Sequence, residues 1–264
     1  MNIKKIKLIY FSPTSTTKKT LENITQGLQC NNVEHLNLTS SSAATCEFEQ
    51  LQSDELAIIG MPVYSGRLPT IAVERLKRLK AEKSPAVVVV VYGNREYDDA
   101  LLELKDLAAE IGFVPIAGGA FIGEHSFSND ETPIAVGRPD LEDLEKTKTF
   151  GKNINENLLQ INQSGQSPLL KVPGNFPYKP LKSLSEAPIT NEEKCTQCKL
   201  CLTVCPTEAI EFNGSILTNQ EACIKCCACV KVCPTNARVM PPQINQIAER
   251  LSTNCSQRKA PEFY

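Results

Sequence analysis

The sequence predicts an α/β fold: a doubly wound, five-stranded parallel sheet with a second, small α+β domain after it. Two observations carry this prediction. Over residues 1–162, five apolar runs alternate with four helical patterns, and strands separated by helices form parallel sheets with right-handed crossovers. Over residues 189–240 one cysteine pattern occurs twice, which predicts a small domain with pseudo-twofold symmetry. A proline-rich linker, residues 163–188, joins the two domains, and residues 241–264 form a tail.

The expected elements follow the spacing of the apolar residues along the chain. We expect strands at Ile3–Phe11, Val33–Leu38, Leu56–Pro62, Ala86–Tyr92 and Val114–Phe121, and helices at Thr16–Leu28, Thr70–Lys80, Asp98–Ile111 and Leu141–Leu159. Valine dominates the fourth strand, as suits a buried strand, and Gly112 is a stop signal after the third helix. Five such strands favour the order 2-1-3-4-5, in which ligands bind at the carboxyl ends.

We expect the linker to be extended and packed against the first domain, and the end of the tail to be loosely held. The linker carries Pro168, Pro173, Pro177, Pro180 and Pro188, so we expect an extended segment. Its apolar residues are expected to pack along the first domain; they are Leu169, Leu170, Val172, Phe176 and Tyr178. In the tail we expect a short amphipathic helix over Ile244–Leu251, with the last residues loosely held.

The repeated cysteine pattern predicts two iron–sulfur clusters. The first copy is Cys195-x2-Cys198-x2-Cys201-x3-Cys205-Pro206, and the second is Cys223-x2-Cys226-x2-Cys229-x3-Cys233-Pro234. Three closely spaced thiolates share one loop. The fourth, followed by proline, is expected to leave the loop at the start of a short helix and to ligate the other cluster. We therefore assign Cys195, Cys198, Cys201 and Cys233 to one 4Fe-4S cluster, and Cys205, Cys223, Cys226 and Cys229 to the other. The alternative is a pair of zinc sites, which two separate four-cysteine runs fit poorly.

Four further cysteines lie outside this pattern. Cys30, Cys46 and Cys255 are isolated, and we interpret them as inert thiols. Cys227 interrupts the second motif, where it is either a spare ligand or a neighbour of the cluster. Because the pattern is complete without it, we favour the second interpretation.

A loop after the first strand predicts a phosphate site. Ser12-Pro13-Thr14-Ser15-Thr16-Thr17 opens a helix, where hydroxyls and free backbone N–H groups can bind phosphate. The alternative is an ordinary helix cap. The chain has no GxxxxGK[ST] and no GxGxxG, which argues against a P-loop and a dinucleotide fingerprint. No aspartate ends the first strand, which argues against a phospho-receiver domain.

Loops after two further strands extend this candidate site. Both offer glycine for close backbone approach and tyrosine for stacking on a flat ring, which favours a flavin over ordinary turns. The candidate cofactor-binding residues of the three loops are Ser12, Thr14, Ser15, Thr16 and Thr17, then Pro62, Val63, Tyr64, Ser65 and Gly66, then Tyr92, Gly93, Asn94, Arg95 and Tyr97. Glu124 and His125 follow the fifth strand and are expected to border the same site. For His125 we weigh a proton donor to reduced flavin against a structural hydrogen bond, and favour the latter.

The residues around these motifs resemble known families. Residues 188–240 resemble bacterial-type ferredoxins, and the N-terminal part looks like a flavodoxin, with Ser15 where the phosphate loop of that family usually has glycine. The whole chain resembles the flavodoxin–ferredoxin fusion proteins of anaerobic bacteria and archaea, which carry similar phosphate, PVYxGRLP and YGNR segments. The resemblance implies a flavodoxin-like fold and FMN rather than FAD. It also implies that Tyr64 or Tyr97 stacks on the flavin ring.

Together these features predict electron transfer. A flavin accepts two electrons and a cluster one, so we expect a converter between one-electron carriers and two-electron chemistry, with a ferredoxin-like redox partner. The alternatives are a carrier without functional flavin and a flavin-dependent reductase of a small organic substrate. A wide gap between cluster and flavin would require either a homodimer, with electrons crossing between chains, or a domain motion. The net charge of −2 suggests no nucleic-acid role, and without a signal peptide or membrane span we expect a cytoplasmic protein.

Overall fold

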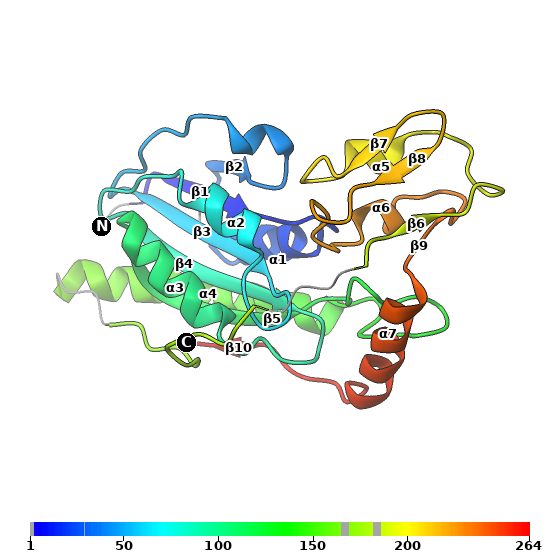
Figure 1. Ribbon diagram of the computed structural model, residues 1–264. Helices are drawn as coiled ribbons and strands as arrows, with labels where there is room; N and C mark the ends of the chain where they lie inside the picture. The colour runs from blue at the N-terminus through cyan, green and yellow to red at the C-terminus, as the bar shows by residue number, and fades with distance from the viewer. Residues whose placement is uncertain (1–2, 29, 165–168, 182–185) are drawn as a thin grey trace.

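The computed structural model describes residues 3–28, 30–164, 169–181 and 186–264. The first domain has the predicted alternation of strands and helices (Figure 1). Its strands are β1 (Lys5–Tyr10), β2 (Val33–Asn37), β3 (Glu55–Pro62), β4 (Pro85–Tyr92) and β5 (Val114–Ile122). Its helices are α1 (Thr16–Thr25), the 3-10 turn η1 (Ser41–Ala44), α2 (Thr70–Leu76), α3 (Ala100–Ile111) and α4 (Leu141–Ser164).

These five strands are parallel to one another in the predicted order 2-1-3-4-5. The flavodoxin-like fold class is therefore confirmed. Side chains alternate between the two faces, so that Val88 and Val90 pack under α2 and α3 whereas Val87 and Val89 pack under α1 and α4. Because helices cover both faces, the carboxyl ends of the strands form the open edge at which a ligand can bind.

The tail corrects one expectation, because its end is a strand. β10 (Glu262–Phe263) pairs antiparallel with β5 and extends the sheet to six strands. The Phe263 ring stacks on Phe150 of α4, with 4.8 Å between ring centroids. The expectation of loose last residues was wrong because a strand of two residues has no detectable periodicity. The helix before it, α7 (Pro242–Asn254), includes the predicted Ile244–Leu251.

The described part of the linker, residues 169–181, lies along α3. Leu170 and Val172 pack against the core as expected, and the Tyr178 hydroxyl donates to Asp106 at 2.8 Å. Leu169 and Phe176, expected to pack likewise, are instead 84% and 78% exposed. Polar contacts attach this part of the linker to the first domain instead, because the Asp99 carboxylate accepts hydrogen bonds from the backbone N–H groups of residues 175 and 179. Pro168 lies outside the described residues.

The second domain is small and lies beside the carboxyl ends of the sheet (Figure 1). It consists of β6 (Ile189–Thr190), α5 (Leu200–Thr203), β7 (Ile210–Phe212), β8 (Ile216–Thr218), α6 (Ala228–Lys231) and β9 (Arg238–Val239). β6 pairs with β9 and β7 pairs with β8, both antiparallel. The two short helices each end before the fourth cysteine of a motif. The expectation that a helix starts at the fourth cysteine was therefore wrong, and the Cys-Pro pairs lie in turns after the helices. Among the described residues, no helix combines the length and apolarity that a membrane crossing needs.

Candidate cofactor sites

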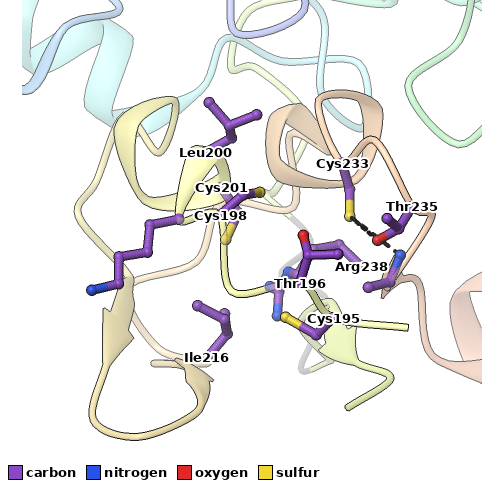
Figure 2. A pocket seen from close by; sticks show the side chains of 11 residues that line it. Cys195, Thr196, Cys198, Leu200, Cys201, Ile216, Cys233, Thr235 and Arg238 are labelled. Atoms are coloured by element: carbon purple, nitrogen blue, oxygen red, sulfur yellow. Dashed lines mark hydrogen bonds between the residues drawn. The ribbon is translucent and has the colours of Figure 1, made fainter. Parts of the chain in front are cut away.

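Two cysteine-lined cavities lie in the small domain. The first, of about 310 Å³, is lined by Cys195, Cys198, Cys201 and Cys233. Figure 2 shows these four side chains around an open space, with Cys233 reaching it from the opposite side to the other three. The second, of about 320 Å³, is lined by Cys205, Cys223, Cys226 and Cys229, and also by Cys227. The structure thus brings together each predicted set of four, including the crossover of the fourth cysteine.

The cavities suit a cluster better than a single metal ion. Among the described residues, no three His, Cys, Asp or Glu side chains converge on a position where one ion could bind. A zinc site needs four ligands about 2.0–2.3 Å from one point. Four cysteines arranged around one open space instead suit a cluster that is ligated at several corners.

Left-handed turns shape both cysteine loops. Gln197 and Lys199 have φ of 55° and 61° in the first loop, and their repeat mates Lys225 and Cys227 have 58° and 62°. Such residues turn the chain tightly, so that successive cysteines face one centre. Cys227 is therefore a turn residue, matched in the first loop by a lysine.

The burial of Cys227 agrees with this role. It is 1% exposed and packs with Met240 and Ile244, and it also lines the second cavity beside Cys226. Its thiol donates to the Lys225 carbonyl at 3.7 Å and to the Met240 sulfur at 3.5 Å. These contacts support the interpretation of Cys227 as a neighbour of the site.

Burial makes these cavities unfavourable for free thiolates. It raises the pKa of Cys226 to about 12, and it also raises the pKa of Cys223 and Cys229. Burial opposes ionisation of Cys233 too, but backbone N–H groups outweigh it and lower the pKa of that thiol. Metal binding must displace these protons, so cluster insertion and folding of this domain are coupled.

Backbone N–H groups point at the sulfurs in the same pattern in both halves. Ala209 donates to Cys205 at 3.3 Å, and its repeat mate Ala237 donates to Cys233 at 3.2 Å. Lys225 donates to Cys223 at 3.4 Å. Such bonds stabilise thiolate ligands and tune the reduction potential of a cluster that they hold.

A third cavity, of about 440 Å³, lies where the carboxyl ends of β1, β3, β4 and β5 meet. Nine of the predicted cofactor-binding residues line it: Ser12, Thr14, Thr16, Thr17, Pro62, Val63, Tyr64, Tyr92 and Gly93. Ser15 lines an adjoining cavity of about 800 Å³. It has φ of 65°, a conformation that favours glycine, which is the usual residue of the flavodoxin loop at this position.

Five predicted residues line neither of these two cavities. They are Ser65, Gly66, Asn94, Arg95 and Tyr97. The Asn94 amide donates to the carbonyls of Cys255 and Gln257, at 2.6 and 2.8 Å. The Tyr97 hydroxyl lies 2.8 Å from both the Glu262 carboxylate and the Tyr264 hydroxyl. Of the two tyrosines considered for stacking, only Tyr64 lines the cavity.

His125 closes one wall of the third cavity, as expected from its place after β5. Gly93 permits this, because a Cβ there would lie 2.2 Å from the His125 ring. The Nδ1 atom accepts the Phe127 backbone N–H at 3.0 Å, which is the structural hydrogen bond that we favoured. Burial, followed by the nearby cations Arg95 and Lys231, lowers the pKa of His125 to about 4. The neutral ring therefore carries its proton on Nε2 at neutral pH.

The second and third cavities are neighbours across the domain boundary. Tyr64 lines the third cavity, and burial together with the nearby Cys226, Cys227 and Cys223 raises its pKa well above the ordinary value. Ile224, which lines the second cavity, packs against the core of the first domain. The Tyr64 side chain thus lies between the second cavity and the third.

Two cations hold the domains together. The buried Arg75 of α2 donates to the Leu38 and Thr39 carbonyls and, at 2.6 Å, to the Pro206 carbonyl beside Cys205. Lys231 of α6 pairs with Glu124 at 3.0 Å and donates to the Ser128 carbonyl at 2.8 Å. Neither contact could be predicted from a local sequence pattern, since each joins residues far apart in the chain.

Comparisons with known proteins support the assignment of the small domain. Residues 187–234 match a family described as "4Fe-4S dicluster domain". No curated protein matches the sequence. The first domain is similar to solved structures at low identity, and its fold class rests on its own sheet order.

Three of these structures illustrate the likeness. A flavodoxin from the domain Archaea is 14% identical (59% of this chain, 99% of that chain, TM-score 0.37). A flavodoxin of Streptococcus pneumonia is 15% identical (57% and 97%, TM-score 0.38), and the flavodiiron protein of Giardia intestinalis is 14% identical (62% and 38%, TM-score 0.40). A dicluster domain after a flavodoxin-like sheet fits the resemblance to flavodoxin–ferredoxin fusion proteins.

Proposed function

We propose that this protein is an electron-transfer flavo-iron–sulfur protein that links one-electron carriers to two-electron flavin chemistry. Each cysteine-lined cavity would hold one 4Fe-4S cluster, and the third cavity would hold FMN. When bound, the clusters supply single electrons and the flavin stores a pair. No dinucleotide fingerprint accompanies the third cavity, which supports FMN over FAD.

The arrangement of the three cavities carries this proposal. The first and second share one small core, in which Cys201 of one set packs with Cys229 of the other. The second adjoins the third through Tyr64. Electron transfer requires closely spaced sites within a dry matrix, and this order supplies them within one chain. A homodimer is therefore not needed to bring a cluster near the flavin.

Exposure supports a direction for partner docking. Cys198 of the first set is exposed, whereas Cys226 and Cys229 of the second set are buried. Leu200, which lines the first cavity, is 42% exposed, and Ile189 nearby in the small domain is 51% exposed. A redox protein of the ferredoxin type would thus exchange electrons at the first cluster, in the cytoplasm.

A reductive titration tests this proposal. Anaerobic protein is titrated with dithionite while the visible spectrum and the electron paramagnetic resonance signal are recorded. We expect about four electron equivalents per chain, one for each cluster and two for the flavin. About two equivalents, with no flavin band and no uptake of added FMN, would instead identify a two-cluster carrier on a flavin-free scaffold.

A further inference from the structure

The internal repeat is broken at one buried position. Ile210 of β7 and Arg238 of β9 are repeat mates, each five residues after the fourth cysteine of its motif. Both are buried, at 6% and 3% exposure. Ile210 lines the second cysteine cavity and Arg238 lines the first (Figure 2). Arg238 thus places a cation in the second half of the repeat, at the position that the aliphatic Ile210 occupies in the first half.

Neutral groups hold the Arg238 guanidinium. Nη1 donates to the Thr190 hydroxyl at 2.7 Å, and Nη2 donates to the Thr218 hydroxyl at 2.8 Å and to the Pro188 carbonyl at 3.0 Å. Nε is buried and has no hydrogen-bond partner among the described residues. None of the acceptors is a carboxylate, although a buried cation is costly unless a negative group compensates it.

The remaining contact of Arg238 points to that negative group. Nη2 lies 3.8 Å from the sulfur of Cys229, which belongs to the second set, while the side chain lines the first cavity. Arg238 therefore contacts a cysteine of the second set and lines the cavity of the first. With thiolates and clusters in place, the net negative charge on either side would compensate the guanidinium.

We propose that Arg238 is a potential-setting residue, a buried cation that stabilises the reduced state of the clusters on both sides of it. The inference rests on the proposed function, but only on its iron–sulfur part. Reduction gives a cluster one electron and no proton, and so adds one negative charge beside the guanidinium. In a medium of low dielectric constant, that charge is stabilised far more than near an exposed cation.

The test compares Arg238→Gln with the wild-type full chain. Glutamine keeps a polar side chain but removes the charge. Both proteins are purified anaerobically, their iron is counted, and the two cluster potentials are determined by titration with dithionite, the electron donor, under electron paramagnetic resonance detection. We expect the reduction equilibrium constant of at least one cluster to fall about tenfold or more, which is 59 mV for one electron. Arg238→Lys, which keeps the charge, should shift it less.

Lys199→Gln is the matched control, because Lys199 also lines the first cavity but is exposed. Solvent screens its charge, so we expect a change below about threefold. Wild-type potentials in Arg238→Gln with eight irons per chain, or an equal shift in Lys199→Gln, would overturn the inference. Wild-type protein without eight irons would instead refute the proposed function.

Arg238→Gln could lose its clusters because the guanidinium also binds Thr190 and Thr218. Arg238→Lys then becomes the test. A lysine is a point charge without the forked guanidinium that contacts Cys229 while its side chain lines the first cavity, so the two potentials should respond unequally, by about threefold or more at one of them. Unchanged potentials at both clusters in Arg238→Lys would overturn the inference.

Discussion

Replacing His125 with asparagine is expected to remove an acid sensitivity from the flavin-side cavity. In the folded protein, burial lowers the pKa of His125 to about 4 from its ordinary value of 6.5. The unfolded chain therefore binds a proton between pH 6.5 and 4 that the folded chain does not. The contribution of the neutral His125 to the free energy of unfolding is fully present above pH 6.5 and is lost as the pH falls toward 4. Asparagine does not titrate and keeps an acceptor for the Phe127 N–H.

The size of this effect follows from the pKa difference. A difference of about 2.5 units, at about 1.4 kcal/mol each, gives about 3 kcal/mol once the titration is complete. At pH 5 about 2 kcal/mol of this is already lost. For a chain of this size, about 2 kcal/mol corresponds to roughly 4–8 °C in the unfolding midpoint. On acidification to pH 5, the midpoint of the wild type should therefore fall by that much more than the midpoint of His125→Asn.

Two measurements check this prediction. The chain has only two histidines, so ring-labelled histidine gives two nuclear magnetic resonance signals, and His125→Asn identifies its own by removing it. Thermal unfolding midpoints of both proteins at pH 7.5 and pH 5 give the difference in stability. Any acid loss of the clusters should affect both proteins equally, so it cancels in the comparison. An apparent pKa of 6.5 or above for His125, or an equal loss of stability in both proteins, would refute the reasoning.

Four further substitutions probe the other sites. Tyr64→Ala should weaken FMN binding about tenfold by removing the aromatic wall of the cavity, as measured by flavin fluorescence; unchanged affinity would exclude Tyr64 from the site. Ser15→Gly should stabilise the protein by about 0.5–1 kcal/mol, because relief of the left-handed conformation exceeds the added chain entropy; a lower unfolding midpoint would contradict this. Arg75→Met should lower the free energy of unfolding by about 1–3 kcal/mol, since the carbonyls of Pro206, Leu38 and Thr39 lose their buried donor. A thermal unfolding midpoint equal to that of the wild type would disprove the role of Arg75 in holding the two domains together. Cys227→Ala should keep eight irons per chain with a stability loss of about 1 kcal/mol, and a fall to four irons would show that Cys227 is a ligand.

The sequence predicted what local patterns encode. The strand order follows from five apolar runs with helices between them, and the grouping of the eight cysteines follows from ligand spacing. Both patterns can be recognised in short stretches of sequence, and the known ligand crossover of the repeated motif pairs its two copies. The cavity residues Ser12 to Thr17 were found by the same logic, because a loop after the first strand must reach the carboxyl edge.

What the sequence did not predict depends on contacts between distant segments. Asn94 has the composition of a flavin loop residue, yet its amide binds carbonyls more than 160 residues away in the tail. β10 has two residues and no periodicity, so only its pairing with β5 defines it. Arg238 could have been found as the break in the repeat, opposite Ile210, but its burial and its contact with Cys229 are properties of the fold.

The most direct test of the central claim is a count of cofactors in anaerobically purified full-length protein. Iron and acid-labile sulfide are determined per chain, zinc is measured in the same sample, and released flavin is identified by chromatography. We predict eight irons, eight sulfides and one FMN per chain, since each cysteine-lined cavity would take one 4Fe-4S cluster and the third cavity one flavin. Zinc in place of iron, or eight irons with no flavin bound even after FMN is added, would contradict the account.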